Sequence, residues 1–146
     1  MKPTPRFLLV GAGALVALVA ARAFIVSGAF SDVCGDRILS VLPSPDDQLQ
    51  AVIFERDCGA TTDFSTQVTL LRRGAPPPSD VGNVLIVDAD HGRAPTRPGG
   101  GPVVTVRWVR PDSLEMRFHR RARVFRQAEL VGAVKIGYSL FGEDGA

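Results

Sequence analysis

The chain has 146 residues, of which 45% are hydrophobic and 22% are charged, and its formal net charge is +2. This length allows one domain with a real core and excludes a second. Three basic residues lie within the first 22 positions, and the remainder carries 14 Lys and Arg against 15 Asp and Glu, a net charge of −1. A nucleic-acid binder carries its positive charge in the folded domain, so we expect no nucleic-acid partner.

The N-terminal segment is typical of an export signal. Lys2 and Arg6 precede an unbroken run of apolar or small residues at positions 7–21, and the apolar character resumes after Arg22. A helix over residues 7–30 would be about 36 Å long, which is enough to span a bilayer and contact the membrane. The basic residues before it favour a cytoplasmic N-terminus.

Two versions of this signal lead to different locations. An uncleaved signal anchor at residues 1–30 would make a single-pass protein of the inner (cytoplasmic) membrane, with residues 31–146 as an extracytoplasmic domain in the periplasm or at the cell surface. A signal peptide cleaved near Ala23 would release a secreted domain. We favour the anchor, because cleavage there would leave a mature domain that begins with a strongly apolar run.

The chain has two cysteines, Cys34 and Cys58. In an exported domain, such a pair is expected to form one disulfide. Between them lie an apolar stretch at residues 38–42, turn-forming residues at 43–47 and a second apolar run at 51–54, which together predict a β-hairpin. Folding the chain back about Asp46, which is equally far in sequence from Cys34 and Cys58, places the two cysteines opposite each other, so the disulfide would close the open end of the hairpin.

Further strands follow along the chain. They are predicted at residues 67–71, 83–88, 103–109, 114–119 and 134–140. The stretch at 83–88 is almost wholly apolar, which favours a central strand. In the strand at 114–119, Leu114, Met116 and Phe118 share the core face and His119 lies on the wet face.

Two stretches between these strands lack the pattern of a strand. Residues 91–102 hold four glycines and three prolines and are expected to form a mobile loop. Residues 120–131 could include a short helical turn, but no amphipathic helix of useful length is predicted. The fold class is therefore all-β, a small antiparallel sandwich or partly open barrel of about six or seven strands, preceded by one N-terminal hydrophobic helix.

Residues 57–66 gather hydroxyl and carboxylate side chains between two predicted strands. Thr61, Thr62 and Asp63 are the candidate residues for binding a small molecule or a glycan. The favoured interpretation is structural: Gly59 permits a turn, and the short side chains satisfy backbone donors that the turn leaves unpaired. A pocket lined by the three candidates and approached by a histidine would favour ligand binding or catalytic chemistry instead.

Arg120, Arg121 and Arg123 form the one concentrated basic patch outside the N-terminus. The patch could contact an anionic envelope polymer or lipid headgroups. A solvated strand edge, where charge prevents sheet-to-sheet aggregation, is the favoured interpretation. An exposed apolar patch beside these arginines would indicate a partner.

Metal sites and catalytic sites are not predicted. Asp88 and Asp90 resemble the start of a calcium loop, but Gly99 stands where the bidentate glutamate should be, so a strand-ending turn is the better account. The two cysteines and two histidines lack the close spacing of a structural zinc site. We therefore expect no metal, no cofactor and no catalytic residue.

The segment CGATTDFSTQV, together with SPDDQLQAVIF, GNVLIVDAD and VTVRWVRPDSLEMRF, resembles a family of small bacterial exported proteins. The resemblance covers about residues 34–141, and its most specific part is the pattern CGATTxFSTxV. It implies no activity and assigns no role to any residue. Two of these pieces also resemble the strand-turn-strand units of β-propeller blades, but they are too few to close a propeller.

These features together predict a membrane-tethered extracytoplasmic β-domain that interacts with an envelope component or a partner protein and is not an enzyme. The second hypothesis is a small-molecule or glycan-binding module that uses the loop at 57–66. A hydrolase is the third.

Overall fold

The computed structural model describes residues 34–59, 62–78 and 80–143. The predicted anchor at 1–30 lies outside them, and within them no helix is long and apolar enough to cross a membrane. The described residues form nine strands: β1 (Gly35–Pro43), β2 (Leu49–Asp57), β3 (Ser65–Arg72), β4 (Leu85–Asp88), β5 (Val104–Arg110), β6 (Ser113–His119), β7 (Arg123–Gln127), β8 (Leu130–Val131) and β9 (Val134–Phe141).

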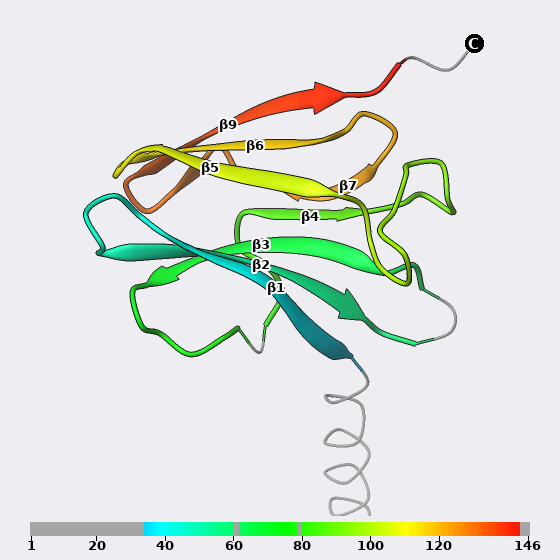
Figure 1. Cartoon of the computed structure of the whole chain (residues 1–146), viewed down its shortest axis with the longest axis horizontal. Coiled ribbons are helices and arrows are strands. Elements are labelled where there is room, and N and C mark those ends of the chain that lie inside the picture. The colour runs from blue at the N-terminus through cyan, green and yellow to red at the C-terminus, as the bar shows by residue number, and fades with distance from the viewer. Residues whose placement is uncertain (1–33, 60–61, 79, 144–146) are drawn as a thin grey trace, which may run out of the picture. The chain divides into compact units, whose positions relative to one another are not determined.

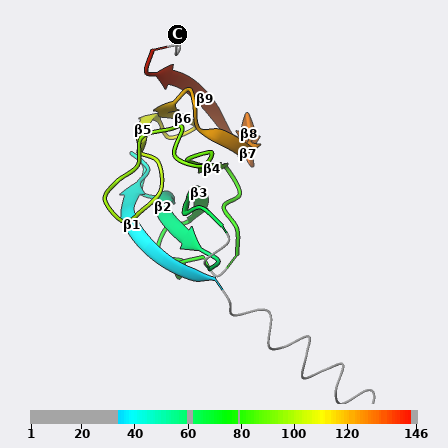
Figure 2. The ribbon, with the colours of Figure 1, turned by 90° about the vertical axis from the view of Figure 1, so that its right-hand side faces the viewer.

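The strands form two sheets that lie one above the other (Figures 1 and 2). The first has five strands in the order β1-β2-β3-β4-β7, and the second has four in the order β5-β6-β9-β8. The all-β class is confirmed. The prediction of a wholly antiparallel domain with six or seven strands is wrong, because β6 and β9 are parallel and the described residues hold nine strands.

The parallel pair follows from the path of the chain. After β6 the chain leaves the second sheet, adds β7 to the first sheet, and returns through β8 to β9. Such a crossover lets two strands of one sheet run in the same direction, which a tight hairpin cannot do. No pattern in the sequence predicts this crossover, because β7 and β8 are short. Both lie within residues 120–131, where the sequence predicts a short helical turn.

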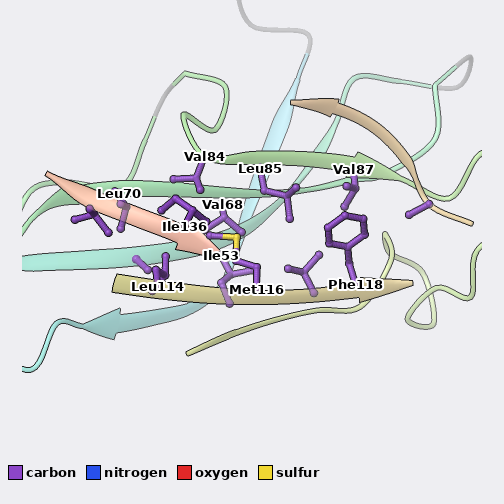
Figure 3. Close-up of a cluster of buried hydrophobic side chains, with 14 of the residues drawn as sticks. Ile53, Val68, Leu70, Val84, Leu85, Val87, Leu114, Met116, Phe118 and Ile136 are labelled. Atoms are coloured by element: carbon purple, nitrogen blue, oxygen red, sulfur yellow. The ribbon is translucent and has the colours of Figure 1, made fainter. Parts of the chain in front are cut away.

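The hydrophobic core lies between the two sheets, as Figure 3 shows. Ile53, Val68 and Leu85 enter it from the first sheet. Leu114 and Met116 enter it from the second, and Leu114 has no exposed surface. Each such side chain stabilises the fold by about 1.5 to 3 kcal/mol when it is fully buried.

The predicted first hairpin is confirmed. Gly35 lies opposite Asp57, and the adjoining Cys34 and Cys58 are joined in a disulfide at the open end. The register then shifts by one residue at a bulge between Ile38 and Ser40. Because of this bulge, the pairing predicted from a fold-back about Asp46 holds only at the open end of the hairpin, from Gly35 to Ile38.

Ser44 builds the turn of this hairpin. Its carbonyl accepts a hydrogen bond from the Asp47 N–H at 2.9 Å, which places Pro45 at the second position of the turn. Its hydroxyl donates to Asp46 Oδ1 at 2.6 Å and accepts from the Leu49 N–H at 3.0 Å. The proline thus stands where its fixed backbone angle is needed.

The remaining strand predictions hold in outline, with one correction. Val84 and Leu85 have no exposed surface, and β4 lies between β3 and β7, as expected for a central strand. His119 is buried rather than on the wet face, with 8% of its surface exposed. The chain turns there, since the Ala122 N–H donates to the His119 carbonyl, and the His119 ring packs edge-on against Phe141.

Two side chains connect the layers at opposite sides of the sandwich. Trp108 on β5 donates its Nε1–H to the Leu42 carbonyl on β1 at 3.0 Å. Tyr138 on β9 donates its hydroxyl to the Ala128 carbonyl, just after β7, at 2.7 Å. Each layer is therefore attached to the other by polar bonds as well as by the core.

The disulfide gives a first test. Reducing the full chain should lower the free energy of unfolding by about 3 to 4 kcal/mol, because the reduced unfolded chain regains the freedom of an open loop. The measurement is thermal unfolding in detergent micelles with and without a reductant. The double variant Cys34→Ser/Cys58→Ser should not respond to the reductant, and two free thiols in the full chain before reduction would contradict the pairing.

Tyr138 gives a second test, because it is the one tyrosine of the chain. Burial, with a smaller contribution from the charge of Glu129, raises the pKa of Tyr138 to about 12. The ultraviolet absorbance of the folded protein should therefore titrate near pH 12, and that of the urea-unfolded chain near its ordinary value of about 10.

The sign of the effect on stability follows from this raised pKa. The unfolded chain loses the phenol proton first, so the free energy of unfolding is constant below about pH 10 and falls as the pH rises through the folded pKa. Tyr138→Phe removes both the absorbance step and this alkaline loss. A folded protein that titrates at the ordinary value would contradict the burial of this hydroxyl.

Candidate functional site

The outer face of the five-stranded sheet, turned away from the core, carries a row of polar side chains. Arg56 on β2 pairs with Ser65 on β3, Ser65 with Asp88 on β4, and Asp88 with Arg123 on β7. Because partners in register point to the same side of a sheet, the four side chains lie in one line across four strands.

A pocket of about 460 Å³ lies over this row. We call it the outer-face pocket. The loop after the disulfide contributes Thr62 and Asp63, the loop after β4 contributes His91, and β7 contributes Arg123 and Phe125. Its volume is within the range of about 300 to 1,000 Å³ that ligand pockets in proteins have.

The structure places two of the three predicted loop residues, Thr62 and Asp63, at this pocket. Thr61 lies outside the described residues. Thr62 lines the pocket, but its hydroxyl donates to the Gly59 carbonyl at 3.2 Å, which is the structural role that the sequence favoured. Asp63 accepts a hydrogen bond on Oδ2 from the His91 N–H at 2.7 Å, and His91 Nδ1 lies 3.8 Å from the same oxygen.

The predicted arginines differ in their relation to this pocket. Arg123 lines the pocket, where its Nε donates to Asp88 Oδ1 at 3.1 Å and its Nη2 pairs with the other oxygen of that buried carboxylate. This hydrogen bond raises the pKa of Arg123, so its charge is fixed. Arg120 and Arg121 lie in the turn between β6 and β7 and are not among the residues that line the pocket.

Phe125 lines this pocket, although no pattern in the sequence predicts it as a site residue. Ile86 pairs with Arg126 and Val87 pairs with Val124, which leaves Phe125 as the extra residue of a β-bulge. Such a bulge redirects a side chain. The ring lines the pocket with 59% of its residue surface exposed, and the Arg123 guanidinium carbon lies 4.9 Å from the ring centroid.

The hydroxyl groups of Thr62 and Ser65 have hydrogen-bond partners within the protein. The Ser65 hydroxyl donates to the Arg56 carbonyl at 3.4 Å and accepts from Gln67 Nε2 at 2.8 Å. Among the described residues, no hydrogen bond joins a hydroxyl of this pocket to His91. Within the same residues, no group of three His, Cys, Asp or Glu side chains could hold a metal ion.

Glu55 forms a second cluster of charged groups, on the inner face of β2. Its side chain is 2% exposed and accepts five hydrogen bonds. Two come from Arg37 on β1, two from Arg97 at 3.1 and 2.9 Å, and one from the Gly101 N–H at 2.9 Å. A buried carboxylate needs such partners, because an unpaired one would cost several kcal/mol.

The segment at 91–102, for which the sequence predicts a mobile loop, is bonded to this carboxylate and to Thr66, its neighbour on β3. Thr66 donates its hydroxyl to the Pro102 carbonyl at 2.7 Å, and Thr96 bridges Pro102 within the loop. A Cβ at Gly100 would lie 2.4 Å from Glu55 Oε1, so the glycine permits a close approach. The glycines therefore let the loop pack closely over Glu55. The role of this cluster is to hold the loop against the sheet.

Burial raises the pKa of Glu55, but the hydrogen bonds from Arg37, Arg97 and the Gly101 N–H outweigh it, so the pKa lies below its usual value. The carboxylate is thus charged throughout the physiological range. It has no oxygen left for a substrate, since Arg37 occupies Oε2 and the other donors occupy Oε1.

A comparison of the chain with protein-family models, with curated proteins and with solved structures finds no match. The resemblance carried by the CGATTxFSTxV pattern stays a prediction. The roles of the residues in both clusters are therefore argued from their geometry alone.

Glu55 gives a third test. Glu55→Gln should lower the free energy of unfolding by about 3 kcal/mol, because the neutral amide leaves two arginines without their carboxylate. Since the folded pKa is lowered, this stabilisation is present above the unfolded pKa of about 4.3 and is lost as the pH falls through the folded value. Thermal unfolding of the full chain from neutral pH into this acidic range measures both effects.

The matched control is Glu115→Gln. Glu115 pairs with Arg107, but its side chain is 53% exposed, so this variant should change the free energy of unfolding by less than about 1 kcal/mol. An equal decrease in the free energy of unfolding of the two variants would show that the burial of Glu55 adds nothing to the stability of the fold.

Proposed function

We propose that this chain is a membrane-tethered, extracytoplasmic binding domain that contacts an envelope component or a partner protein through the outer-face pocket. One observation carries the proposal: residues from β7 and from three loops that are distant in sequence line the same pocket. Pockets with exposed apolar side chains beside a few fixed polar groups are typical of binding sites.

Apolar surface at the rim supports the proposal. Val81 and Phe125 line the pocket and are 51% and 59% exposed. A large exposed aromatic ring loses contact with water when a partner covers it, which makes it a typical anchor of an interface. Its position beside the predicted basic stretch is the arrangement that favours a partner over a merely solvated edge.

The tether rests on the sequence, and the disulfide agrees with it. Residues 7–30 are long and apolar enough for one membrane crossing. A disulfide persists in an oxidising compartment, which supports a domain on the outer side of the membrane. A binding surface on such a domain would face the envelope.

Photo-crosslinking in the native membrane tests the proposal. A photoreactive amino acid replaces Val81 or Phe125 in the full chain, and adducts are detected by mass spectrometry. We expect the same adduct from both positions, because both side chains line one pocket.

The matched control is the same amino acid at Val109 on β5, which is 42% exposed and belongs to the other sheet. It should yield no such adduct. Equal labelling from Val109, or no adduct from either pocket position, would contradict a binding role for this pocket.

Right-side-out vesicles of the inner membrane test the location. Protection of the domain from added protease in these vesicles would contradict its extracytoplasmic location.

A further inference from the structure

The charges that line the outer-face pocket cancel. Arg56 and Arg123 are matched there by Asp63 and Asp88. Arg123 is bonded to Asp88, and Arg56 donates at 2.7 Å to each oxygen of Asp36, beside the pocket. An anionic ligand would have to displace a bonded carboxylate, and a cationic one would meet two guanidinium groups, so the lining favours an uncharged ligand.

The polar groups of the pocket offer both donors and acceptors. Asp63 accepts the His91 N–H on one oxygen, and its other oxygen can accept further hydrogen bonds. The His91 side chain is 78% exposed and can donate or accept. This mixture fits hydroxyl groups, since each hydroxyl also donates one bond and accepts others.

Phe125 supplies an apolar face next to these polar groups. The bulge turns the ring toward the pocket, and Val81 extends the apolar rim. The face of an aromatic ring carries partial negative charge, and the carbon-bound hydrogens on one side of a sugar ring are weakly positive. A sugar therefore matches both parts of the pocket at once.

The same bulge disfavours a polypeptide partner that would add a strand to β7. Strand addition needs an unbroken row of backbone donors and acceptors along the edge. A bulge in an edge strand interrupts that row and is a common protection against it.

We propose that the outer-face pocket binds an uncharged glycan, with one sugar ring packed on Phe125 and its hydroxyls bonded to Asp63 and His91. This inference names the ligand of the site proposed above and rests on that function. The glycan is thus the envelope component that the tethered domain contacts.

Calorimetric titration of the full chain in nanodiscs tests the inference. The probes are three uncharged tetrasaccharides, maltotetraose, cellotetraose and chitotetraose, at up to millimolar concentration. Vesicles of phosphatidylglycerol and a polyglutamate peptide are the anionic comparisons. We expect saturable binding of at least one tetrasaccharide and none of the anionic probes.

Variants locate the binding. Phe125→Ala should weaken it by about tenfold, which corresponds to the loss of one aromatic contact, and Phe125→Tyr should retain it. Asp63→Asn should also weaken it, whereas Val109→Ala on the other sheet should not. An intact disulfide and an unchanged melting temperature show that each variant is folded.

The outcomes separate the inference from the function on which it rests. Tetrasaccharide binding that Phe125→Ala leaves unchanged, or no binding of any tetrasaccharide, overturns the glycan inference. If crosslinking from Val81 and Phe125 succeeds in that case, the pocket still binds and its ligand belongs to another class, such as a protein. If crosslinking fails as well, both proposals are wrong.

Discussion

The buried carboxylate of Glu55 is the constraint on which the arrangement of this domain depends. It accepts bonds from β1, from Arg97 and from the Gly101 N–H, and so fixes the segment that carries the chain from the first sheet to the second. A charge at this depth is tolerable because every one of its oxygens is bonded. The segment then reaches Asp63 through the His91 N–H, so the same loop also forms one wall of the outer-face pocket.

The sequence predicts those parts of the fold that local patterns control. Alternating side chains reveal the β5–β6 hairpin, and the spacing of Cys34 and Cys58 gives the register at the open end of β1 and β2. The parallel pairing of β6 with β9 escapes prediction, because it depends on a crossover between sheets. His119 shows the same limit: strict alternation places it in water, but the chain turns at that residue and the side chain is enclosed.

The site is predictable only in part, for a related reason. Thr62 and Asp63 attract notice as a cluster of oxygen atoms, yet their partner His91 comes from a loop that sequence spacing does not connect to them. Phe125 lies inside a run dominated by arginines, and a bulge decides which way its ring points. The sequence favours a solvated position for Arg123, whereas the structure pairs it with Asp88, a buried aspartate on the neighbouring strand. Each of these features depends on how distant segments of the chain come together, which the local sequence does not reveal.

The exchange of strands between the two sheets has a consequence for how the domain assembles. The first sheet lacks its fifth strand until β7 has been added, and β7 follows two strands of the second sheet in the chain. The second sheet in turn is completed by β9, the last of the described strands. Neither layer is a contiguous stretch of sequence, so neither can form first and serve as a finished template. We therefore expect the sandwich to fold in one cooperative step that needs all of the strands from β1 to β9, and the proposed binding surface to exist only once that step is complete.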